Sequence, residues 1–194
     1  LVWLNAGSRI TYSQGFGVGN RKIELIGEGY FEVKRNEEVP FLVKTNSLLV
    51  KVLGTKFNFR DYPDDAEAIV SLSEGKVALN NLLKKEKEAF LLPNERVVLN
   101  KKNGRMHVEY STVSNALQWT NGYLFFDEEL LPDVVKELER SYNVKIQIAS
   151  DTLNTFRFYG NFVHREQNIQ EVLEALSATR KIHYIIEGHN ITLY

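Results

Sequence analysis

The chain has 194 residues, of which 43% are apolar, 25% charged and 11% aromatic. This composition is typical of a globular protein and excludes an intrinsically disordered chain, and the length allows one large domain or two small ones. Lys and Arg together number 24 and Asp and Glu 25, so the formal net charge of −1 gives no strong attraction for nucleic acid. The sequence contains no Cys, which excludes disulfides, thiolate metal sites and Cys nucleophiles.

No stretch of the sequence approaches the ~18 consecutive apolar residues of a membrane span. The chain also does not open with the charged and then apolar segment of a signal peptide. Because the first residue is Leu1 rather than Met, we expect a piece of a longer protein, with an anchor or targeting segment upstream.

From the start to about residue 110, apolar and polar residues alternate with the period of two that is typical of β-strands. The predicted strands are short runs rich in β-branched and aromatic residues: 9–12, 22–26, 30–34, 41–45, 48–53, 56–60, 67–72, 76–79, 89–92, 96–99 and 106–110. Turn residues separate them, most clearly Asn103-Gly104, and none of this part has a helical period. The pattern predicts an all-β domain over residues 1–112, as a sandwich, a roll or a solenoid-like stack.

The hydrophobic period changes near residues 111–118, and two helices are predicted in the remainder. Five apolar residues at helical spacing predict the first helix: Leu131, Val134, Val135, Leu138 and Tyr142. Its solvent side would carry Lys136, Glu137, Glu139 and Arg140. The second helix follows from the apolar stripe Ile169, Val172, Leu173 and Leu176. Asn168 and Glu171 form a capping-box pattern at its start.

Strands are predicted around these helices at 123–126, 144–148, 156–163, 182–187 and 191–194. The order is βαβ-βαβ, which predicts a small α+β domain over residues 118–194, a sheet with both helices on one face. The whole chain is thus expected to be a mixed fold of two modules joined at residues 111–117. We expect Trp119, Phe126, Leu138 and Tyr142 in the core of the second module. An alternative place for Trp119 is between the two modules, as a peg that joins them.

The sequence shows no constellation typical of an enzyme or a metal site. The four His residues form no pair that would present two nitrogens to one metal: His107, His164, His183 and His189. The glycines of 15–19 precede a predicted strand rather than a helix, which favours a hairpin loop over a phosphate-binding loop. Residues 61–65 lack EF-hand spacing, and the mixed charges of 84–88 indicate a solvated hairpin tip. We therefore predict no enzymatic activity, no cofactor and no metal.

One predicted strand has a face suited to recognition. Phe156, Phe158, Gly160 and Phe162 lie on one side of it, and Arg157, Tyr159 and Asn161 lie on the other. If the first side packs on the helices, the second is a Tyr, Arg and Asn surface of the kind enriched at protein interfaces. A sheet that simply presents polar residues to solvent would show the same pattern. Arg157, Tyr159 and Asn161 are therefore the candidate partner-binding residues.

Several motifs in the first part occur as an ordered set: LNAGS at 4–8, GEGYFEV at 27–33, PFLV at 40–43, LGTKFN at 53–58 and EGKV at 74–77. In this set the chain resembles the periplasmic region of FecR-like anti-sigma regulators, in the form common in Bacteroidetes. The second part is similar to the C-terminal module that follows in this family, through WxxGxLxF at 119–126, LERxYxV at 138–144 and EVL at 171–173. That module is itself similar to the short N-terminal domain of secretins and TonB-dependent receptors.

The resemblance implies a single-pass inner-membrane protein whose cytoplasmic segment, absent from this sequence, holds an extracytoplasmic-function sigma factor. It also implies that the periplasmic region binds the signalling domain of a TonB-dependent outer-membrane transporter. The near-zero charge and the lack of a catalytic cluster agree with such a protein-binding role. A strand of the receptor domain is expected to pair with the edge strand that carries Arg157, Tyr159 and Asn161.

Two other functions compete with this interpretation. A carbohydrate-binding β-sandwich would need exposed aromatic residues along a groove, for which Trp3, Tyr12, Phe16 and Tyr30 are candidates. A hydrolase would need a nucleophile and a base that the sequence does not show.

Overall fold

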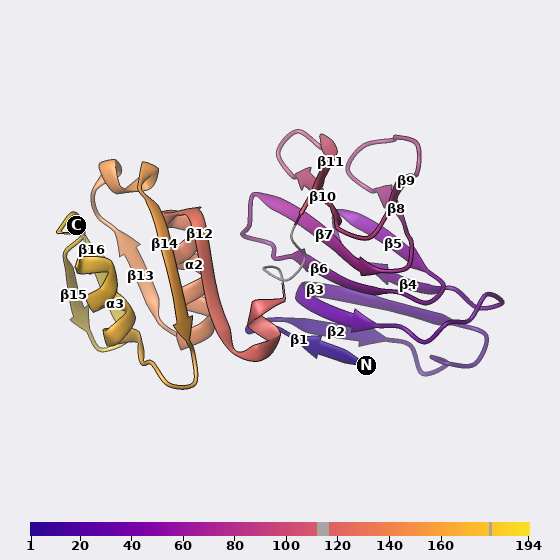
Figure 1. Ribbon diagram of the computed structural model, residues 1–194, viewed down its shortest axis with the longest axis horizontal. Helices are drawn as coiled ribbons and strands as arrows, with labels where there is room; N and C mark the ends of the chain where they lie inside the picture. The colour runs from indigo at the N-terminus through magenta and orange to yellow at the C-terminus, as the bar shows by residue number, and fades with distance from the viewer. Residues whose placement is uncertain (112–116, 179) are drawn as a thin grey trace. The chain divides into compact units, whose positions relative to one another are not determined.

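The computed structural model describes residues 1–111, 117–178 and 180–194. These residues form two compact units, Leu1–Thr120 and Asn121–Tyr194 (Figure 1). The link predicted at residues 111–117 falls mostly on residues 112–116, which lie outside the described residues. No helix in the described ranges is both long enough and apolar enough to cross a bilayer.

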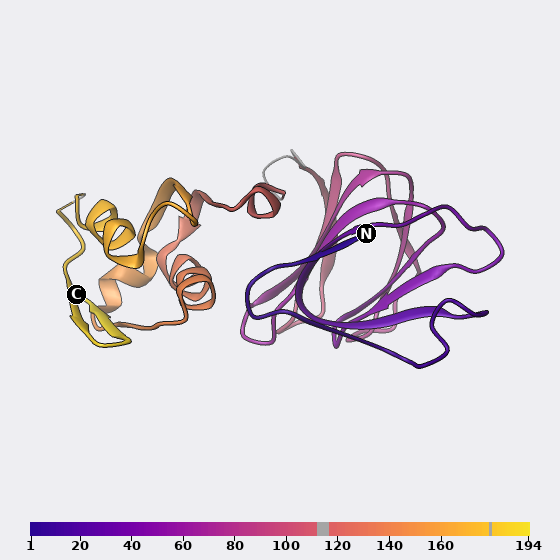
Figure 2. The same cartoon turned by 90° about the horizontal axis from the view of Figure 1, so that it is seen from below.

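The first unit consists of strands, which confirms the prediction from its period-two pattern. The strands are β1 (Val2–Leu4), β2 (Arg9–Tyr12), β3 (Arg21–Glu32), β4 (Phe41–Lys44), β5 (Leu48–Val52), β6 (Lys56–Asp61), β7 (Glu67–Glu74), β8 (Val77–Asn81), β9 (Ala89–Leu91), β10 (Glu95–Asn100) and β11 (Met106–Tyr110). Their order in the sheet is β11-β10-β7-β6-β3-β4-β5-β8-β9, with β1 and β2 also paired to β3. Because β9 contacts β10, the sheet rolls up and is nearly closed (Figure 2).

The long strand β3 belongs to both halves of this roll. Its first residues pair with β2 and β4, and its last residues pair with β1 and β6. Between them, Gly27 has a φ of 98°, and a Cβ there would lie 2.4 Å from the Ser8 hydroxyl oxygen. Only glycine combines this backbone angle with such a close approach, so Gly27 permits the change of partners.

The core of the first unit fills the inside of the roll. The side chains of Phe31, Phe57 and Phe59 are completely buried there, and the rings of Phe31 and Phe57 stack with their centroids 5.1 Å apart. Successive residues of a strand point to opposite faces, so alternate residues of each strand reach this core. Burial of these apolar side chains supplies the main stabilisation of the unit.

The second unit contains both predicted helices. Its elements are β12 (Tyr123–Leu130), α2 (Leu131–Tyr142), β13 (Lys145–Ile148), η2 (Asp151–Thr155), β14 (Arg157–Val163), α3 (Ile169–Ser177), β15 (Tyr184–Glu187) and β16 (Asn190–Leu193). The predicted capping box of α3 is present, because the Glu171 backbone N–H donates to Asn168 Oδ1 at 3.1 Å and the Asn168 backbone N–H donates to Glu171 Oε2 at 2.7 Å. These two bonds satisfy N–H groups that the start of a helix leaves open.

The prediction of one sheet with both helices on one face is wrong. The strands form two sheets, β12-β14 and β13-β16-β15, and α2 contacts strands of both. In Figure 2 the helices lie between these sheets. The expected solvent side of α2 is wrong for Glu137, which is buried and whose Oε2 accepts a hydrogen bond from Arg140 Nη2 at 3.2 Å. The other residues expected there are partly exposed: Lys136, Glu139 and Arg140. Hydrophobic period shows which face of a strand is buried, but not which strand it pairs with.

The core of the second unit contains three of the four residues predicted for it. Phe126 and Leu138 are buried and Tyr142 packs against the same cluster. The prediction for Trp119 is wrong, because this residue lies in the short turn η1 (Gln118–Asn121) and belongs to the first unit. Its partners there are described below.

Candidate functional site

The outward face of β14 carries the three candidate partner-binding residues. Phe158 and Phe162 are buried in the core of the second unit, whereas Arg157, Tyr159 and Asn161 are exposed, as the alternation predicts. Tyr159 is the most accessible aromatic residue on the strand, at 58% exposure. The structure thus brings the three residues together on one surface.

Gly160 explains how the buried side of this strand is packed. The rings of Phe158 and Phe162 are nearly parallel, at 4°, with centroids 6.1 Å apart. A Cβ on Gly160 would lie 2.6 Å from the Phe158 ring and 2.8 Å from the Phe162 ring. The two rings therefore close over the glycine, and the strand is held flat against the core with its other face outward.

A β-bulge in β12 brings Glu128 to this surface, where the sequence pattern did not predict it. The register between β12 and β14 shifts between Phe126 and Glu129, and Glu128 in this bulge has a φ of 55°. Arg157 Nη1 donates to the Glu128 carbonyl at 2.5 Å. Interaction of the Tyr159 hydroxyl with the nearby Glu128 carboxylate raises the pKa of Tyr159 above its ordinary value. Bulges often re-aim side chains beside functional surfaces, and here the bulge orients two of the candidates.

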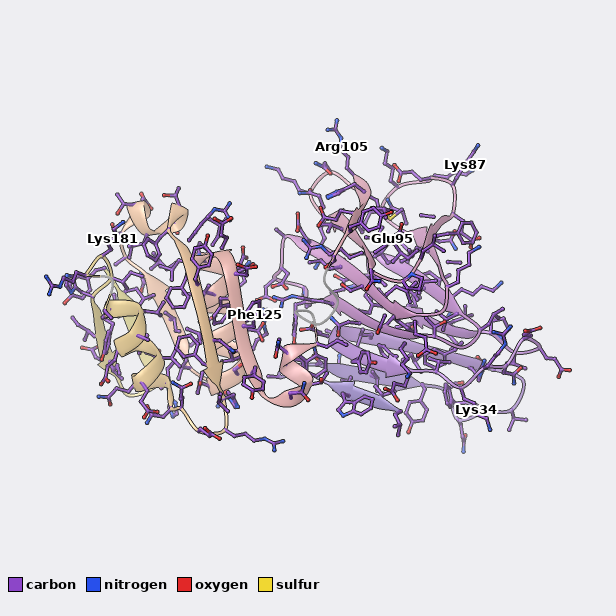
Figure 3. The ribbon with its side chains drawn as sticks, in the orientation of Figure 1. Lys34, Lys87, Glu95, Arg105, Phe125 and Lys181 are labelled. Carbon is purple, nitrogen blue, oxygen red and sulfur yellow. The ribbon has the colours of Figure 1, made fainter. Side chains whose placement is uncertain are left out.

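A second residue missed by sequence reasoning is Phe125. It lies directly opposite Asn161 in the register and is 36% exposed, pointing away from the helices (Figure 3). Its position between buried Leu124 and Phe126 was the signal that could have found it. We define the β14 face as Phe125, Glu128, Arg157, Tyr159 and Asn161.

The backbone of β14 is also available to another strand. In the described ranges β14 pairs only with β12, and the two form a separate sheet. One edge of β14 therefore has no neighbouring strand. The strand contains neither Pro nor Lys, which commonly protect sheet edges from pairing. The β14 face thus combines exposed Tyr, Arg, Asn and Phe side chains with an open edge.

A second polar cluster lies in the first unit, around the buried carboxylate of Glu28. Asn58 Nδ2 donates to Glu28 Oε1 at 2.7 Å, and Asn5 Nδ2 donates to Glu28 Oε2 at 2.9 Å. Arg60 Nη1 lies 3.8 Å from the same Oε2. Trp119 Nε1 donates to Asn58 Oδ1 at 3.3 Å, which explains why Trp119 lies in this unit. We call these five residues the Glu28 network.

The motif LNAGS at 4–8 is held by bonds next to this network. The Glu28 backbone N–H donates to Ser8 Oγ at 2.8 Å, and the Tyr62 hydroxyl donates to the Ala6 carbonyl at 2.7 Å. Buried polar groups of this kind need such partners, because their desolvation is otherwise costly. The motif residues therefore fix the start of the chain against β3 and β6.

The other sequence candidates form no functional cluster. In the described ranges no group of three or more His, Asp and Glu residues is arranged to hold a metal ion. Of the acidic residues in 61–65, Asp61 pairs with Lys101 at 2.7 Å and Asp65 pairs with Arg60 at 2.9 Å. The His164 ring packs against the Tyr142 ring at a tilt of 45°, with centroids 4.8 Å apart. These contacts are structural.

The aromatic residues proposed for a carbohydrate groove form two separate pairs. Trp3 contacts Tyr30 with ring centroids 5.4 Å apart, and Tyr12 contacts Phe16 at 5.5 Å. Tyr30 is buried, at 8% exposure, and so presents no ring face to a sugar. This arrangement disfavours the carbohydrate-binding alternative.

Two family models match the chain: FecR protein over residues 1–78 and FecR, C-terminal over residues 123–193. Two crystal structures of a candidate anti-sigma factor from Parabacteroides distasonis ATCC 8503, at 1.65 and 2.50 Å resolution, each match with a TM-score of 0.88 and 33% sequence identity. The match covers 100% of this chain and 89% and 88% of those chains. No curated protein sequence matches the chain. This chain therefore belongs to the FecR-like family of anti-sigma factors.

Proposed function

We propose that this chain is the sensor region of a transmembrane anti-sigma factor and binds the signalling domain of a TonB-dependent outer-membrane transporter. In this proposal it lies on the periplasmic face of the inner membrane, as part of a single-pass protein. A cytoplasmic segment of the same protein would hold an extracytoplasmic-function sigma factor. Family membership supports the anti-sigma role. The observation that carries the receptor contact is the open edge of β14 beside an exposed Tyr and Arg.

The contact would form by strand addition. A strand of the receptor domain pairs with the backbone of β14, and these main-chain hydrogen bonds supply affinity. Side chains at every second position, Arg157, Tyr159 and Asn161, then select the partner. Tyr and Arg suit this role because they retain favourable contacts when water is removed from an interface.

The Glu28 network supports a role for the first unit in passing the receptor signal along the chain. Trp119 lies in η1, and β12 begins only a few residues later at Tyr123. A displacement of β12 on receptor binding would therefore act on Trp119 through the chain. Hydrogen bonds through Asn58 and Glu28 connect Trp119 to Asn5, which directly follows β1. The network thus provides a path from the turn before β12 to the beginning of the chain.

The experiment is a calorimetric titration with the signalling domain of a TonB-dependent transporter from the same organism. Tyr159→Ala should weaken binding by about 2 kcal/mol, roughly thirtyfold, without a large change in thermal stability. Tyr194→Ala is the matched control, since Tyr194 is exposed to a similar degree, 49%, and lies outside the β14 face. Unchanged affinity for both Tyr159→Ala and Arg157→Ala would exclude this surface, and no binding by the wild-type chain would contradict the receptor contact itself.

A further inference from the structure

The strand β15 forms an open edge of the three-stranded sheet β13-β16-β15 (Figure 1). Among the residues that the structure describes, β15 pairs only with β16. None of its four residues is buried, and it contains neither Pro nor Lys, which commonly protect a sheet edge. One side of β15 is therefore accessible to another strand.

The backbone groups that β15 presents at this edge follow from its pairing with β16. The His183 N–H donates to the Tyr194 carbonyl at 2.9 Å, and the Tyr194 N–H donates to the His183 carbonyl at 3.0 Å. Backbone groups of successive residues in an antiparallel strand point to opposite sides. The N–H and C=O groups of Tyr184 and Ile186 therefore point to the open edge, whereas those of Ile185 point to β16.

The side chains of β15 are apolar on both faces of the sheet. Ile186 lies opposite Ile191, which is 2% exposed, so Ile186 is on the core side of the sheet. Ile186 is nevertheless 39% exposed, because no strand of the described chain lies on its other side. Ile185, on the outer face, is 50% exposed. A further strand at this edge would cover apolar surface on both faces.

We propose that β15 pairs with the β15 of a second copy of this chain, antiparallel and across a two-fold axis at Ile185. In this register Tyr184 lies opposite Ile186 of the second copy, and Ile186 lies opposite Tyr184. All the backbone groups at the open edge are then used, which gives four main-chain hydrogen bonds across the axis. A register shifted by two residues would pair only one residue of each strand in this way.

The side chains of residues 183–187 are self-complementary in the same register. Ile185 meets its own copy on the outer face, and Tyr184 covers the exposed Ile186 of the second copy on the core side. His183 lies opposite Glu187 of the second copy, so an imidazole N–H faces a carboxylate twice in the dimer. The β14 edge belongs to the other sheet, and each copy therefore keeps it open for the receptor contact.

The first test is sedimentation equilibrium of the wild-type chain over a range of concentrations. A four-residue strand gives a small interface, so we expect a monomer–dimer equilibrium with a Kd on the order of 100 µM. Glu187→Lys should weaken the dimer about tenfold, because it places a lysine opposite each His183. Glu166→Lys is the matched control, since it makes the same charge change at an exposed position of the turn after β14. A wild-type chain that stays monomeric at about 1 mM, or equal effects of the two variants, would overturn the proposal.

Mixing two weakened variants tests the antiparallel register. His183→Glu should also weaken the dimer, because it places two carboxylates opposite each other. An equal mixture of His183→Glu and Glu187→Lys should associate to within about threefold of the wild-type affinity, since each cross-strand pair then has opposite charges or the native partners. Within one chain the two positions are about 13 Å apart along the strand, so they cannot restore each other. No recovery in the mixture would overturn the proposal.

A cysteine probe locates the two-fold axis, because the chain has no Cys of its own. Ile185→Cys should form an intermolecular disulfide under mild oxidation, since the Cα atoms of such a pair lie about 4.5 Å apart. Gln147→Cys is the control, because Gln147 is exposed on the same face of the sheet but lies on β13. Ile185→Cys should cross-link at least about tenfold faster, as expected for a preformed pair. Equal rates would overturn the proposal, and so would a wild-type chain that is monomeric but binds a receptor signalling domain through Glu187, since the edge would then belong to the receptor.

Discussion

Glu28 shows how a single buried carboxylate organises the first unit. Its side chain is only 5% exposed, and an ionised group in such a place is costly unless it is well hydrogen-bonded. Asn5 and Asn58 each donate to one of its oxygens, and Arg60 adds a nearby positive charge. Three segments distant in sequence, together with Trp119, therefore depend on one another. Removing one partner leaves a buried polar group of the network with one hydrogen bond fewer.

Asn58→Ala tests this dependence. It removes a donor to Glu28 and the acceptor of Trp119, and should lower the free energy of unfolding by about 1–3 kcal/mol. In a Trp3→Phe background, which leaves Trp119 as the only tryptophan, the emission should also shift to longer wavelength. Urea unfolding followed by fluorescence measures both. The control is Asn80→Ala, which removes a bond from Asn80 Nδ2 to the exposed Glu88. An equal effect of the two variants would show that the Glu28 network adds no stability.

Elements formed by short-range patterns could be predicted from the sequence. The strands of the first unit, both helices and the Asn168 cap follow from residues close together in the chain. The two-sheet arrangement, the Glu128 bulge and the place of Trp119 depend on partners 30 to 60 residues away and could not be predicted from period alone. For the candidate site, the exposure of Arg157, Tyr159 and Asn161 was predicted, whereas Glu128 and Phe125 were missed.

Helix α2 shows how the two-sheet arrangement affects the stability of the second unit. It contacts strands of both sheets, so Leu138, which is completely buried, lies among apolar residues of both. Leu138→Ala should lower the free energy of unfolding by about 2–5 kcal/mol, since the cavity left behind cannot collapse easily. Chemical denaturation monitored by circular dichroism measures this loss. Gln170→Ala, at an exposed position of α3, should change it by less than about 0.5 kcal/mol, and a similarly small effect for Leu138→Ala would contradict the burial of α2.

At the scale of the whole chain, a net charge of −1 conceals local charge separation. The strand β14 begins with Arg157, and the bulge of β12 beside it carries Asp127, Glu128 and Glu129 in succession. Such local fields guide a partner into register more than they add affinity. A nearly neutral chain with separated charges is therefore suited to selecting one protein partner, and the receptor contact needs the β14 face to be accessible.

The division of the chain into two units leads to a prediction about limited proteolysis. The strand pattern ends at Tyr110 in β11, and the side chain of Trp119 in η1 bonds Asn58. The η1 turn is further closed by the Thr120 N–H, which donates to the Leu117 carbonyl. The first cut by a protease of broad specificity should therefore fall within residues 111–117, before η1, rather than at the unit boundary after Thr120.

The Trp119→Ala variant tests whether the bond to Asn58 protects η1 from the protease. Without the bond to Asn58, η1 loses its side-chain anchor, and the cuts should extend to residues 118–122. Mass spectrometry of the earliest fragments locates the cuts, and Trp3→Phe, which leaves η1 unchanged, is the control. A first cut inside residues 67–79 would show that β7 and β8 open more readily than the link, and that the strands of the first unit do not form one cooperative body. Identical fragments from wild type and Trp119→Ala would show that the bond to Asn58 does not hold η1 in place.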